Sequence, residues 1–70
     1  MKILRGMVTD AINDPMIDLD ELIEASYMVK FTSSTDRPAR AFRQYITLAH
    51  EAVSDNHRRF WLNSALDLAN

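Results

Sequence analysis

The sequence contains no cysteine and offers only one glycine and two prolines, and these shortages exclude several classes of protein. Without cysteine, disulfide bridges, thiolate metal sites and thiol catalysis are excluded, and a reducing, cytoplasmic location is expected. The longest apolar runs, Tyr27-Met28-Val29 and Phe60-Trp61-Leu62, have three residues. A membrane-spanning helix needs roughly 20, so we expect no membrane partner. Amphipathic sequence follows Met1 and Lys2 directly, and no signal peptide is therefore expected.

The charge balance is that of an ordinary globular protein with no general attraction for polyanions. Apolar residues make up 47% of the chain and charged residues 26%, and the formal net charge is −2. Disordered chains are poorer in apolar residues, and nucleic-acid-binding domains are usually strongly basic. The length suits one small helical domain over residues 1–70. Because a core of this size is only marginally stable, self-association as a homo-oligomer stays open.

Apolar residues recur at helical spacing through most of the chain, which predicts an all-α fold, a compact bundle of about four short helices. The predicted helices span residues 3–13, 15–30, 37–53 and 55–69. In the first, the apolar face begins at Ile3 and Leu4, although Gly6 costs about 1 kcal/mol relative to alanine. The third has the clearest pattern, with an apolar face that runs from Ala41 to Val53.

The start of the second helix is open between two alternatives. Asp14 is a suitable N-cap if Pro15 occupies the first helical position. Asp18 is also suitable, because Glu21 follows three residues later as in a capping box. With either start, the apolar face continues to the end of the helix near Lys30.

Polar residues separate the remaining helices. Residues 31–36 are rich in hydroxyl side chains, which compete for backbone hydrogen bonds, and Asp36 is placed to cap the helix that follows. The segment from Ser54 to Asn56 supplies a cap for the last helix. The sequence shows no internal repeat and no second domain.

The acidic and histidine residues do not form a known catalytic or metal-binding motif. An EF-hand loop that began at Asp14 would need glycine at its sixth position, where the chain has Leu19. His50 and His57 lack the ligand spacing of motifs such as HExxH. No serine stands in a nucleophile elbow, and no glycine-rich phosphate loop is present. We therefore expect no enzyme activity, no metal and no cofactor.

Several apolar side chains fall outside the predicted core faces and are candidates for partner binding. Phe60 lies about 100° from Trp61 around its helix, Met28 falls opposite the apolar face of its helix, and Phe31 stands beside the polar loop. Such residues either contact a third helix or form an exposed apolar surface that binds a partner. Phe60, flanked by Arg59 and His57, is the best single candidate, since aromatic residues and arginine are enriched at interfaces.

Arginines provide a second candidate surface, for nucleic acid or an acidic partner. Its candidate residues are Arg37, Arg40, Arg43 and Arg58. Helical spacing places Arg40, Arg43, Thr47 and His50 on one outward stripe. A helix-turn-helix motif needs a turn of three or four residues, and the predicted loop is longer, so this alternative is the weaker one.

Taken together, these patterns favour a small non-enzymatic regulator or inhibitor that binds another protein through a helical surface, with a homodimer as one form of such binding. Short phage-type regulators have this general character. The alternative is a nucleic-acid-binding regulator that uses the arginine-lined helix face.

Overall fold

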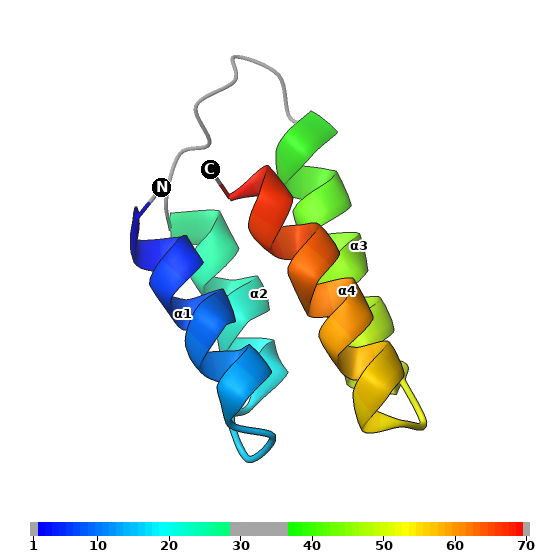
Figure 1. Ribbon diagram of the computed structural model, residues 1–70. Helices are drawn as coiled ribbons and strands as arrows, with labels where there is room; N and C mark the ends of the chain where they lie inside the picture. Colours follow the sequence, from blue (N-terminus) through cyan, green and yellow to red (C-terminus); the bar gives the residue numbers. More distant parts are fainter. Residues whose placement is uncertain (1, 29–36, 70) are drawn as a thin grey trace.

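The computed structural model describes residues 2–28 and 37–69, with side chains for residues 3–28 and 39–69, and these residues form four helices and no strand (Figure 1). The helices are α1 (Lys2–Asn13), α2 (Leu19–Met28), α3 (Arg37–Glu51) and α4 (Asp55–Leu68). The predicted all-α bundle is therefore confirmed. No helix in the described part of the chain is long and apolar enough to cross a membrane.

The helices pack around a square, each against its two neighbours. α3 and α4 share the most extensive contact, α1 packs against α4, α2 packs against α3, and α1 and α2 have the smallest contact. Figure 1 shows α1 beside α2 and α3 beside α4. The fold is elongated along the helices, with principal extents of 34 × 18 × 18 Å. The molecule is thus two helical hairpins that meet along their length.

The core lies along the centre of the bundle and draws on every helix. Its buried members are Leu4, Val8, Ala11, Leu19, Leu22, Phe42, Ile46, Ala49, Leu62, Ala65 and Ala69. Two residues predicted on apolar faces lie outside it, since Ile3 is 69% exposed and Val53 is 96% exposed. Ile3 stands in the first turn of α1, and Val53 lies beyond the last residue of α3.

Asp18, rather than Asp14, caps α2, so the predicted start at residue 15 is wrong. The amide of Asp20 donates to Asp18 Oδ1 at 3.0 Å, and α2 begins at Leu19. Asp14 organises the preceding turn instead, because its Oδ1 accepts the amide of Met16 at 3.0 Å. An aspartate in each position thus satisfies amides that would otherwise be unpaired. The predicted end near Lys30 lies outside the described residues.

α3 ends at Glu51, two residues before the predicted end at Val53, because Ser54 is needed as the N-cap of α4. The backbone of Ser54 is extended (φ −127°, ψ 154°), and its Oγ accepts a hydrogen bond from the amide of His57 at 3.2 Å. The chain must therefore leave α3 before Ser54, and the amide of Ala52 closes the last turn on the carbonyl of Ala49 at 3.2 Å.

Candidate binding surfaces

Phe60 lies on the surface and belongs to a row of three aromatic rings from α3 and α4. Its side chain is 59% exposed, which answers the question that the sequence left open. The ring meets Trp61 edge to face, with centroids 4.9 Å apart, and Trp61 stacks on Tyr45 of α3 at 5.8 Å. Trp61 and Tyr45 are half-buried and pack on the core, so the ring that Phe60 contacts is itself held in place. We call these three residues the aromatic row.

The polar neighbours predicted for Phe60 are also exposed. Arg59 Nε lies 2.8 Å from Asp55 Oδ2 in an ion pair of the first turns of α4, and the Arg59 side chain is 55% exposed. His57 is exposed one turn before Phe60. Met28, at 85% exposure, ends α2, and within the described residues the neighbours of α2 are α1 and α3. Met28 therefore does not extend the aromatic row, and Phe31 lies outside the described residues.

Two of the four arginines predicted to contact nucleic acid or an acidic partner are used inside the protein. Arg58 Nη1 donates to the carbonyl of Ala11 at 2.6 Å, and its Nε donates to Asp55 Oδ1 at 3.1 Å. Arg43 Nε donates to Ser26 Oγ at 2.8 Å. These bonds satisfy groups near the C-terminal ends of α1 and α2, where helical carbonyls lack intrahelical partners.

The predicted outward stripe on α3 is therefore wrong for Arg43, which turns toward α2. Its guanidinium lies over the ring of Tyr27, with Cζ 3.7 Å from the ring centroid, and the side chain is half-buried. Arg40, Thr47 and His50 are exposed as predicted. The side chain of Arg37 is outside the described part of the structure, so an arginine-lined surface on α3 has one described member, Arg40.

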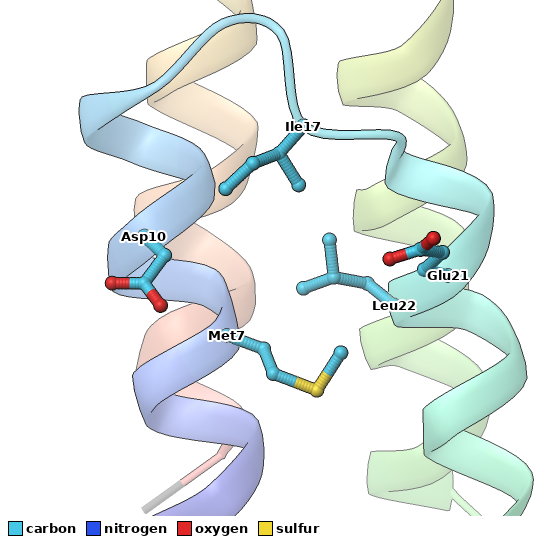
Figure 2. Close-up of a pocket in the computed structure, with 5 residues that line it drawn as sticks. All are labelled: Met7, Asp10, Ile17, Glu21 and Leu22. Carbon is cyan, nitrogen blue, oxygen red and sulfur yellow. The ribbon is translucent and has the colours of Figure 1, made fainter.

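A groove that the sequence did not reveal lies between α1 and α2. It encloses about 220 Å³ and is lined by Met7, Asp10, Ile17, Glu21 and Leu22. Figure 2 shows Met7 from α1, Ile17 from the connecting turn and Leu22 from α2 converging between the two helices. In the same view Asp10 lies on the α1 side and Glu21 on the α2 side. The groove thus has an apolar floor between two carboxylates.

Charge is divided unequally between the two hairpins. Residues 2–28 carry six acidic and two basic side chains, a formal charge of −4, whereas residues 29–70 carry four acidic and six basic side chains, a formal charge of +2. Asp10 and Glu21 are exposed, and neither has an ion pair within the described part of the chain. The groove therefore lies in the acidic half of the molecule.

The fold also brings His50 close to two carboxylates. Ligand atoms of Asp18, Asp20 and His50 lie within 4.8 Å of one another, and all three residues are exposed. However, Asp18 Oδ1 already accepts the amide of Asp20, and the hollow beside Asp18 and His50 is also lined by Arg58. A cation here would share its surroundings with a guanidinium, which disfavours metal binding.

The sequence pattern places Phe60 outside the predicted core face but leaves its exposure open, and it does not indicate the groove. The residues of its floor have the periodicity of core residues, and its carboxylates read as part of a solvated helix face. The hydrophobic periodicity does not give the distance between α1 and α2, because this distance depends on how the helices pack.

In comparisons with known proteins, the chain matches no family model, no curated protein and no solved structure. A functional proposal for this chain therefore depends on its own surfaces.

Proposed function

We propose that the protein is a small, non-enzymatic regulator that acts in the cytosol by docking on another protein through the aromatic row. The observation that supports this proposal is the exposure of Phe60 on a base formed by Trp61 and Tyr45. A ring held this way loses little conformational freedom on binding, which favours association. Full burial of an exposed phenylalanine contributes about 1.5–3 kcal/mol, and Phe60, which is 59% exposed, can contribute part of this.

The surroundings of Phe60 suit a protein partner. Aromatic residues and arginine are enriched among the residues that dominate binding energy, and charged residues form the rim of such sites. Arg59, next to Phe60 in the chain, and its ion-pair partner Asp55 offer both signs of charge at the start of α4, so a partner with a mixed polar rim fits this surface. A second copy of the chain is one such partner, which makes a homodimer a special case of the same proposal.

The test compares Phe60→Ala with the matched variant Ile3→Ala, which truncates an exposed apolar residue on α1. Both variants should keep the helical circular dichroism spectrum and a cooperative thermal unfolding transition, with Phe60→Ala losing only the edge contact to Trp61. The wild type and both variants are immobilised and compared for the protein that each captures from a lysate, and their self-association is compared by light scattering. Phe60→Ala should lose the captured protein or the self-association of the wild type. Ile3→Ala should retain both. Equal behaviour of the two variants in these assays would contradict docking through the aromatic row.

Binding of nucleic acid has less support, because Arg43 and Arg58 are committed to hydrogen bonds within the bundle. Arg40 and Arg59 remain exposed, but they lie on different helices. If nucleic acid is nevertheless the partner, its affinity should fall steeply with salt and should depend on Arg40. Titration of the wild type and Arg40→Ala with a fluorescent DNA duplex at two salt concentrations tests this alternative.

A further inference from the structure

We infer that the groove between α1 and α2 is a second docking site, and that it takes a helical segment of another protein in which an aliphatic side chain lies between lysines or arginines. This site is separate from the aromatic row, which belongs to α3 and α4. It therefore does not depend on the function proposed for Phe60.

The floor of the groove is suited to one aliphatic side chain. Met7 and Ile17 are half-buried, so part of the apolar surface of these two residues stays accessible in the groove. Leu22, the third residue of the floor, is fully buried. Methionine is flexible and polarisable, which lets it adapt to side chains of different shape. The volume of about 220 Å³ is below the roughly 300–1,000 Å³ of typical small-molecule sites, so a protruding side chain fits better than a cofactor.

The carboxylates determine the charge of the occupant. Asp10 and Glu21 lie on opposite sides of the floor and have no ion pair within the described residues, so each is available to a cation (Figure 2). The hairpin that contains them has a formal charge of −4, which attracts a basic segment and repels an acidic one. An apolar side chain between lysines or arginines therefore complements both the floor and the rim.

A helix is the form of segment that the groove favours. The groove lies between two helices, in the region where α1 and α2 have the smallest contact of any neighbouring pair. An amphipathic helix binds such a groove through apolar residues on one face, while its flanking charged residues meet the rim.

The probe is a short synthetic helical peptide of leucine and lysine, with a leucine–glutamate peptide of the same pattern as its counterpart. Methyl and amide NMR spectra of the full chain should show shifts at Met7, Ile17 and Leu22 on addition of the lysine peptide, and none with the glutamate peptide. Glu21→Gln should weaken the binding about two- to fivefold, the range for loss of one exposed ion pair. Glu51→Gln, which removes an exposed carboxylate from the end of α3, is the matched control and should bind as the wild type.

Phe60→Ala should leave these shifts unchanged, so failure of this site and failure of the aromatic row are distinguishable. The inference is overturned if the lysine peptide shifts residues elsewhere, if both peptides bind equally, or if Glu51→Gln weakens binding as much as Glu21→Gln. It is also overturned if the groove signals move with protein concentration in the absence of peptide, because the occupant is then a second copy of the chain.

Discussion

Arg58 of α4 donates a hydrogen bond from Nη1 to the carbonyl oxygen of Ala11, 2.6 Å away, and so joins the last helix to the C-terminal end of the first. Its Nη2 lies 3.4 Å from the carbonyl of Ile12 and 3.0 Å from Asp55 Oδ1. The guanidinium thus replaces the intrahelical donors that the end of α1 lacks. Arg43 does the same for α2 through Ser26. One arginine from each helix of the α3–α4 pair therefore satisfies a helix end of the α1–α2 pair.

Replacement of Arg58 by lysine should lower the free energy of unfolding by about 1–3 kcal/mol. The Arg58 side chain is only 13% exposed, and an ammonium group does not reproduce its fork of donors. Urea denaturation followed by circular dichroism measures the loss. Arg59→Lys is the control, because its exposed pair with Asp55 contributes about 0–1 kcal/mol. Equal losses in the two variants would show that the bonds of Arg58 to α1 do not stabilise the fold.

Arg43 and Ser26 should be energetically coupled. Arg43 Nε donates to Ser26 Oγ at 2.8 Å, and that hydroxyl donates to the carbonyl of Ile23 at 2.6 Å. Ser26 is buried, so removal of either partner leaves polar groups unsatisfied. A double-mutant cycle of Ser26→Ala and Arg43→Lys should give a coupling energy of about 0.5–3 kcal/mol. Additive effects, measured by urea denaturation, would argue against the coupling.

Gly6→Ala should stabilise the protein. Gly6 lies inside α1, is exposed, and has a negative φ, and an added Cβ meets no atom within 4 Å. Alanine in a helix interior is about 0.5–1 kcal/mol more favourable than glycine. The thermal midpoint of unfolding should therefore rise. A fall in this midpoint would contradict the open space around Gly6.

Ser54→Ala should cost about 0.5–2 kcal/mol, the usual loss when an N-cap is removed. The Oγ of Ser54 accepts the amide of His57, which is otherwise unpaired at the start of α4. Ser64→Ala in the same helix is the matched control, since its hydroxyl donates only to the carbonyl of Phe60, which already lies in the helix. That variant should be neutral or slightly stabilising. Chemical denaturation of both variants makes the comparison.

The sequence predicted the helices well because their determinants are local. The apolar periodicity of α3 and the cap of α4 at Ser54 are properties of neighbouring residues. Both α3 and α4 start where predicted. Errors occurred where two local signals competed, as at Asp14 and Asp18, or where a cap cut short an apolar pattern, as at Val53. Local sequence does not show which of two suitable aspartates caps the helix and which one organises the preceding turn.

The candidate sites depend more on tertiary structure. The angle of Phe60 around α4 follows from its position in the helix, but its 59% exposure follows only from the packing of the helices. The hydrogen bonds of Arg43 and Arg58 do not follow from local sequence, because they span 17 and 47 positions of the chain. The groove depends on the packing of α1 against α2, because its lining residues come from both helices and the turn between them.

The separation of Arg58 from Ala11 by 47 positions also has a kinetic consequence. The bond closes a loop of 47 positions in a chain of 70 residues. Because long-range contacts form only after the entropic cost of closing the loop has been met, we expect this bond to form late in folding. Interactions that form after the transition state slow unfolding and leave the folding rate nearly unchanged. Arg58 is therefore expected to lengthen the lifetime of the folded molecule rather than to speed its formation.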